Sequence, residues 1–221
     1  MNIKNYNLIM MNIFKHLSIS ILFMLMGFFI GRSLIPEYIV NMANLFIIVL
    51  LIYILLFKFL AIKNIIPKVF SMNFVYLFTF IMGVLYYPTL IHYFHNLGME
   101  VFISITLGTF ILFLTLAIIA YKKTETCFFK LKDFLYPSLE ILILVTILGI
   151  KFSIFNIIIS ILGIIIFSGY VLYDVSLIKD EIKSNNLNEK NELSIYVLNL
   201  YLDFINILVD LLDLISDIKS N

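Results

Sequence analysis

Seven apolar stretches follow one another along the chain, and each is near the roughly 20 residues that a helix needs to cross a bilayer. They cover residues 17–35, 39–57, 69–91, 101–121, 134–150, 152–178 and 193–215. Pro88 falls inside the third stretch. A spanning helix tolerates a proline when neighbouring groups satisfy the freed backbone, so a kink is expected there rather than a break. The pattern predicts an all-α polytopic membrane protein with seven transmembrane helices.

The seventh stretch carries polar residues on one helical face. Its members are Asn199, Asp203, Asn206 and Asp210, followed by Asp213 and, just beyond the stretch, by Asp217. At roughly 100° per residue all six fall within about 80° of arc. An Asp near the middle of a bilayer costs about 2.5–3.5 kcal/mol on insertion scales, so such a face must look into a protein interior or a wet cavity. We expect Asn199, Asn206 and Asp210 to line a cavity together with Asp203.

Asp174 lies about one turn from the end of the sixth stretch. One interpretation is a solvated residue at the membrane surface, because Lys179 and Asp180 follow shortly after it. The other is that Asp174 faces inward and meets Asp203. Two carboxylates that approach each other in a low-dielectric interior do not both ionise cheaply, so they would share a proton and respond to pH.

The polar face of the seventh stretch also has two interpretations. Interhelical Asn and Asp side chains can form a structural seam that only fixes helix packing. Ionisable residues inside a membrane more often mark an ion pathway, and two acids in register favour the pathway.

Basic residues are distributed unevenly between alternate loops, with twelve on one side and three on the other. The three are Arg32, Lys151 and Lys219. The positive-inside rule then places the amino terminus in the cytoplasm and, after seven crossings, the carboxyl terminus outside. The chain divides into a cytoplasmic segment, 1–16, one transmembrane domain, 17–216, and a short tail, 217–221. A signal peptide is disfavoured at the start, because no small-x-small cleavage site follows and Arg32 comes directly after the apolar run.

Composition supports the membrane assignment, with 62% hydrophobic and 13% charged residues and a mean hydropathy of +1.08. The balance of 15 basic and 14 acidic residues gives no field for nucleic acid, and no nucleic-acid partner is expected. A single cysteine, Cys127, excludes an intramolecular disulfide. His92 and His95 lie near Glu100, but without a further His or Cys an interfacial pair is favoured over a metal site. No motif for a cofactor is present, and none is predicted.

An enzyme has to be weighed, because two Asp on neighbouring membrane helices can form an aspartic-protease dyad. Tyr173 and Asp174 resemble half of the signature of presenilin-type intramembrane proteases. The second half requires glycines beside the other Asp, and Asp203 follows Tyr201 and Leu202 instead. We therefore expect no catalytic activity.

Two segments resemble the Bax inhibitor-1 family, also called the transmembrane Bax inhibitor motif proteins. Residues 167–174 read Phe-Ser-Gly-Tyr-Val-Leu-Tyr-Asp, and residues 200–208 read Leu-Tyr-Leu-Asp-Phe-Ile-Asn-Ile-Leu. Weaker likeness extends upstream to Leu77, through residues 80–83, Pro88 and residues 120–123. Length and layout are most similar to the bacterial branch that includes the inner-membrane modulator of the FtsH protease. This branch implies a multi-pass protein of the bacterial inner (plasma) membrane.

The resemblance implies six helices around a central seventh and a pH-sensing pair, Asp174 and Asp203, that gates a cation leak, mainly of calcium. Family members often carry an acid and a basic partner in the second helix, whereas residues 39–57 contain neither, and Lys58 is the nearest basic candidate. The expected function is a pH-sensitive leak for calcium or protons. The alternative is a non-catalytic modulator of a membrane-embedded ATP-dependent protease. The family motif does not explain Asp210.

Overall fold

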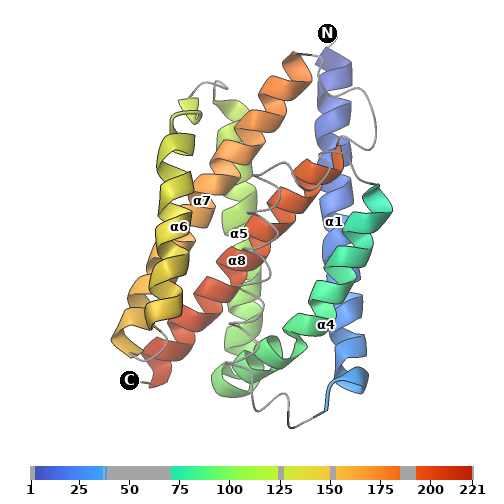
Figure 1. Cartoon of the computed structure of the whole chain (residues 1–221). Helices are drawn as coiled ribbons and strands as arrows, with labels where there is room; N and C mark the ends of the chain where they lie inside the picture. Colours follow the sequence, from blue (N-terminus) through green and yellow to red (C-terminus); the bar gives the residue numbers. More distant parts are fainter. Residues whose placement is uncertain are drawn as a thin grey trace. The chain divides into compact units, whose positions relative to one another are not determined.

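The computed structural model describes residues 3–36, 38, 71–123, 127–149, 153–184 and 193–220. Six long helices occupy these residues: α1 (Ile3–Leu34), α4 (Met72–Leu97), α5 (Met99–Lys122), α6 (Leu131–Gly149), α7 (Ser153–Lys183) and α8 (Leu193–Ser220) (Figure 1). Within the described ranges no strand occurs, which confirms the all-α prediction. The predicted second helix, 39–57, and Lys58 lie outside the described residues.

Five of these helices are long and apolar enough to cross a membrane. Their candidate spans are Asn7–Leu34, Met72–Leu97, Met99–Lys122, Asn156–Lys183 and Leu193–Lys219. The sixth helix, α6, is the shortest and carries Lys132, Asp133 and Glu140. The protein is therefore a multi-pass membrane protein, and the seven predicted crossings are not all accounted for in the described part of the chain.

The helices extend beyond the predicted apolar stretches. α1 begins at Ile3, so the expected amino-terminal segment, 1–16, is already helical for most of its length. α8 continues to Ser220, so the expected tail, 217–221, is mostly helical as well. α4 runs through Pro88 to Leu97, which confirms that this proline does not break the helix. Local polarity did not mark these ends, because a packed helix continues as long as its backbone bonds and contacts continue.

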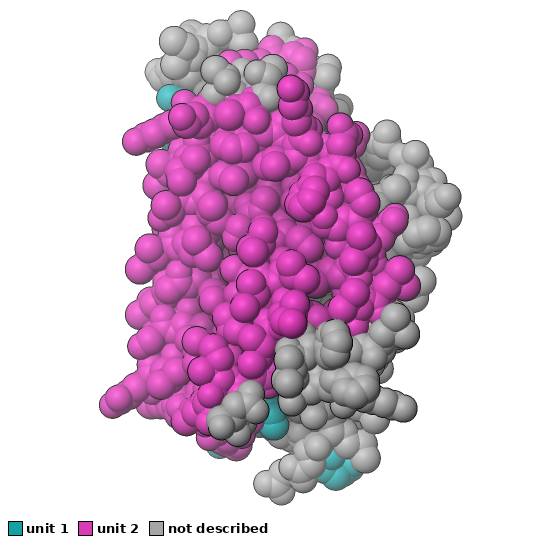
Figure 2. All heavy atoms as spheres, turned by 90° about the vertical axis from the view of Figure 1, so that its left-hand side faces the viewer, with its two compact units in different colours: residues 1–92, 187–201 teal, residues 93–186, 202–221 magenta. Residues whose placement is uncertain are grey.

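The chain forms two compact units (Figure 2). Unit 1 contains residues 1–92 and 187–201, and unit 2 contains residues 93–186 and 202–221. Two helices contribute to both units. α4 passes from unit 1 to unit 2 at Tyr93, and α8 does so at Leu202.

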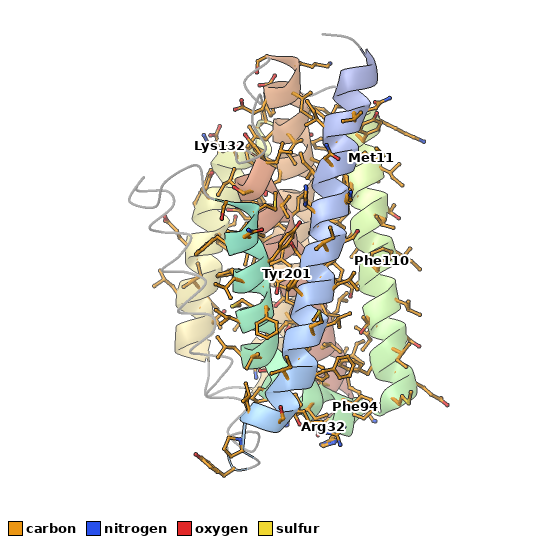
Figure 3. All side chains as sticks on the ribbon, turned by 90° about the vertical axis from the view of Figure 1, so that its right-hand side faces the viewer. Met11, Arg32, Phe94, Phe110, Lys132 and Tyr201 are labelled. Carbon is orange, nitrogen blue, oxygen red and sulfur yellow. The ribbon has the colours of Figure 1, made fainter. Side chains whose placement is uncertain are left out.

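In unit 1, α1 and α4 cross with almost no space between their backbones (Figure 3). A Cβ on Gly27 would overlap the carbonyl oxygen of Phe80, and a Cβ on Gly83 would overlap the carbonyl oxygen of Met24. Small residues at such crossings let membrane helices gain van der Waals contact along their backbones. The glycines therefore determine how closely α1 and α4 approach.

In unit 2, α7 packs against both α5 and α6 (Figure 1). Gly169 of α7 lies beside the Leu135 side chain of α6. The ring of Phe113 on α5 meets that of Phe204 on α8 edge to face, with centroids 5.7 Å apart, a favourable aromatic geometry. These contacts hold α7 and the second part of α8 in a helical core.

Large apolar side chains also project outward from individual helices. Met11 of α1 is 64% exposed and Phe110 of α5 is 45% exposed, and both point away from their helices in Figure 3. α5 has the smallest buried share of the five candidate spans. An outward apolar surface on spanning helices is suited to contact with lipid chains.

Candidate functional site

α8 is buried on all sides in its central part. Every residue from Tyr201 to Leu208 is buried, and the candidate span of α8 has a larger buried share than the other four. Asp203 is only 1% exposed, and Asn206, three residues later, is buried as well. The central part of the polar face, with Asp203 and Asn206, therefore lies inside the protein, as the cost of exposing it to lipid requires.

Asp174 lies inside α7 and is buried, with 7% of its surface exposed. The interpretation as a solvated residue at a helix end is therefore wrong, because α7 continues to Lys183. The apolar stretch in the sequence ends at residue 178, whereas the helix continues through the charged residues that follow. Asp174 is thus held in a buried part of α7.

Tyr170 of α7 is buried in the same unit as the two aspartates. Its hydroxyl donates a hydrogen bond to the carbonyl oxygen of Leu135 on α6, over 3.1 Å. The same hydroxyl lies within electrostatic reach of both Asp174 and Asp203. Because Tyr170 precedes Asp174 by one helical turn, both project from the same face of α7. Tyr170, Asp174 and Asp203 thus belong to the same compact unit.

Two further tyrosines surround Asp174. The ring of Tyr136 on α6 meets the ring of Tyr170 nearly at a right angle, with centroids 6.3 Å apart. Tyr136 and Tyr173 both lie within electrostatic reach of Asp174. Hydroxyl groups of this kind can donate to a carboxylate and accept from a protonated one. The tyrosines give the acidic site polar neighbours that the sequence pattern alone did not assign to it.

Lys179 of α7 is one of the twelve basic residues that the sequence assigned to loops on one side of the membrane. It is instead only 5% exposed inside α7. Its Nζ donates to the carbonyl oxygens of Ala120, Tyr121 and Lys123, over 3.3, 2.8 and 2.5 Å. These groups lie at the end of α5, where carbonyls lack helical partners and favour a positive charge. The side chain of Lys179 thus fixes α7 to the end of α5.

The last turns of α8 carry a second acidic group. Asp213 accepts hydrogen bonds from the Tyr93 hydroxyl of α4, 3.0 Å from Oδ1, and from the Ser160 hydroxyl of α7, 3.1 Å from Oδ2. Lys219 donates to the carbonyl oxygens of Asn96 and Leu97, over 2.9 and 3.2 Å, at the end of α4. Asp210 lies against Gly163 of α7.

The residues predicted to line a cavity do not all belong to the same compact unit. Asn199 is half-buried and belongs to unit 1, whereas Asp203, Asn206 and Asp210 belong to unit 2. Among the described residues, no group of three or more His, Cys, Asp or Glu side chains is arranged to hold a metal ion. His92 and His95 accordingly take no part in such a group.

Comparison with known proteins agrees with the two motifs. The family model described as inhibitor of apoptosis-promoting Bax1 matches residues 6–221. An uncharacterized protein of Borreliella burgdorferi is 33% identical over 123 residues, which are 53% of this chain and 51% of the relative. The chain therefore matches about half the length of this curated relative. Because the family model covers nearly all of the sequence, the chain belongs to the Bax inhibitor-1 family.

Proposed function

We propose that this protein is a pH-sensitive cation leak, in which Asp174 and Asp203 form the gate and calcium or protons are the permeant ions. The observation that carries the proposal is the burial of both acids in unit 2, within electrostatic reach of the Tyr170 hydroxyl. Buried acids inside membrane helices are costly and commonly serve ion or proton transfer. Family membership supports the same assignment.

The gate depends on protonation. Two neighbouring carboxylates that share a proton attract each other through a hydrogen bond, whereas two ionised carboxylates repel each other. A change in pH therefore alters the force between α7 and α8, on which the two residues lie. Tyr170 is bonded to α6, so it holds a fixed polar group beside the pair.

The test is ion flux through purified protein in liposomes, measured for calcium and for protons across a range of pH. Wild type is expected to show pH-dependent flux, and Asp203→Asn is expected to lose the pH dependence. Asp180→Asn on the exposed surface of α7 is the matched control and should behave as wild type. Equal flux from wild type and Asp203→Asn at every pH would contradict the gate.

A second role concerns the outer surface of α1. Leu8 and Met11 are 49% and 64% exposed near the amino terminus, so an apolar surface is available to another membrane protein. We propose that a membrane-embedded ATP-dependent protease binds there and is modulated without catalysis by this chain. Serine at both positions should abolish co-purification with such a protease, whereas serine at Phe110 and Ile111 of α5 should not. Retention of the protease by the α1 variant would contradict this role.

A further inference from the structure

Neither the family motif nor the proposed gate involves Asp210, which lies on α8. The residue as a whole is half-buried, and burial concerns one oxygen of its carboxyl group. The Oδ2 atom is inaccessible to solvent and has no hydrogen-bond partner among the described residues. A buried ionised carboxylate without a partner is among the most costly groups in a protein, and it binds a proton instead.

Gly163 of α7 encloses this carboxyl group. A Cβ at position 163 would stand 2.7 Å from Cγ of Asp210 and 3.0 Å from Oδ1, and it would overlap Oδ2. The backbone of α7 therefore occupies the place where water or a polar side chain would otherwise meet the carboxyl group. This close approach places an apolar wall against Oδ2.

Asp213, three residues later on α8, has the opposite surrounding. One of its carboxylate oxygens accepts from Tyr93 and the other accepts from Ser160. A carboxylate with donors on both oxygens is stabilised in its ionised form. Asp213 in turn lies within electrostatic reach of Asp210, and a neighbouring negative charge opposes ionisation of Asp210. Surroundings that differ in this way can hold two acids in different protonation states.

We propose that Asp210 holds a proton and forms, with Asp213, a second proton-binding site on α8, separate from Asp174 and Asp203. The charged or titratable groups that interact with Asp210, within the described part of the chain, are Tyr93 of α4 and Asp213 of α8, and Asp217 interacts in turn with both of these. α7 contributes the uncharged Ser160 and Gly163. The basic residue in the last turn of α8, Lys219, donates to the carbonyl oxygens of Asn96 and Leu97.

A proton is favoured over a metal ion as the ligand of this site. The described residues provide no group of three or more acids, His or Cys arranged around a metal. Calcium requires six to eight oxygen ligands, whereas the neighbour that lies against Oδ2 is the α-carbon of Gly163. The site does not depend on the leak proposed above, because proton binding is measured directly rather than through flux.

The test is infrared spectroscopy of the full-length protein in detergent at neutral pH. A protonated carboxylic acid has a carbonyl stretching band that a carboxylate lacks, and the band shifts in deuterium oxide. Asp210→Asn is expected to remove one component of this band. Asp203→Asn and the exposed Asp180→Asn are expected to keep that component. A band unchanged by Asp210→Asn would overturn the proposal, as would its loss on addition of calcium to wild type.

A stability measurement keeps the test decisive if the spectra overlap. Asparagine has the shape of a protonated aspartate and carries no charge, so Asp210→Asn should melt at or above the wild-type temperature. Asp213→Asn is the matched control and should melt lower, because it replaces an oxygen that accepts from Tyr93 or Ser160. A lower melting temperature for Asp210→Asn than for Asp213→Asn would show that Asp210 is ionised and would overturn the proposal.

Discussion

The α-carbon of Gly163 on α7 lies directly against the carboxyl group of Asp210 on α8, so that a Cβ there would stand 2.7 Å from Cγ. An acid inside a membrane helix normally requires a polar neighbour, and here the neighbour is a bare piece of backbone. Any larger residue at position 163 must displace the acid. The surroundings of the Asp210 carboxyl group therefore depend on how closely α7 packs against α8.

Gly163→Ala is expected to lower the free energy of unfolding by about 1–3 kcal/mol, the usual cost of overpacking. The added methyl group overlaps the Asp210 carboxyl group and forces that side chain from its place. The measurement is the melting temperature of the purified protein in detergent. Gly108→Ala on α5 is the matched control, because nothing lies within 4 Å of a Cβ at that position. It should leave stability unchanged or raise it by about 0.5–1 kcal/mol. Equal destabilisation by both variants would contradict the close contact.

Gly83→Ala is expected to be more disruptive than Gly163→Ala. Its Cβ would overlap the carbonyl oxygen of Met24 and stand 2.8 Å from the carbonyl carbon, and a backbone cannot rotate away as a side chain can. α1 and α4 would have to separate, which forfeits the dispersion contacts along their crossing. The loss should exceed the upper end of the usual overpacking cost of about 3 kcal/mol. The yield of folded, monodisperse protein and its melting temperature report this, and wild-type behaviour would refute the tight crossing.

Lys179→Met should destabilise unit 2, because three carbonyl oxygens near the end of α5 lose a charged donor. Hydrogen bonds to charged groups contribute about 1.5–3 kcal/mol, and methionine preserves the apolar stem of the side chain. Lys122→Met is the control, since this exposed residue on α5 has no such role. Proteolysis of the segment after α5 should accelerate in the first variant alone. Equal rates in both variants would show that Lys179 does not hold the end of α5.

Two buried tyrosines should respond differently to removal of the hydroxyl group. The Tyr201 hydroxyl is inaccessible and has no hydrogen-bond partner among the described residues, so Tyr201→Phe should preserve or raise stability. The Tyr170 hydroxyl donates to the Leu135 carbonyl oxygen, so Tyr170→Phe should lower stability by about 0.5–1.5 kcal/mol. Melting temperatures of the two variants, compared side by side, test the assignment. A larger loss for Tyr201→Phe would contradict it.

Sequence reasoning anticipated the buried acids and missed their neighbours. The spacing of polar residues in 193–215 predicted one interior face, and Asp203 and Asn206 are indeed buried. The sequence also suggested that Asp174 turns inward, and its burial agrees. The hydrogen bonds of Tyr170 and Lys179 were not anticipated, because their partners lie 35 residues or more away in the chain. Contacts between segments so far apart cannot be read from the pattern of polar and apolar residues within one segment.

Helical type, apolar spans and the unfavourable cost of an acid in lipid were determined by the sequence itself, because they depend on local composition and on a period of 3.6 residues. Only the tertiary structure determines which groups contact each carboxyl group. Asp213 gained donors from α4 and α7, whereas Asp210 gained the backbone of Gly163. The two acids are chemically identical and three residues apart on one helix. Their difference arises from what packing brings against each carboxyl group.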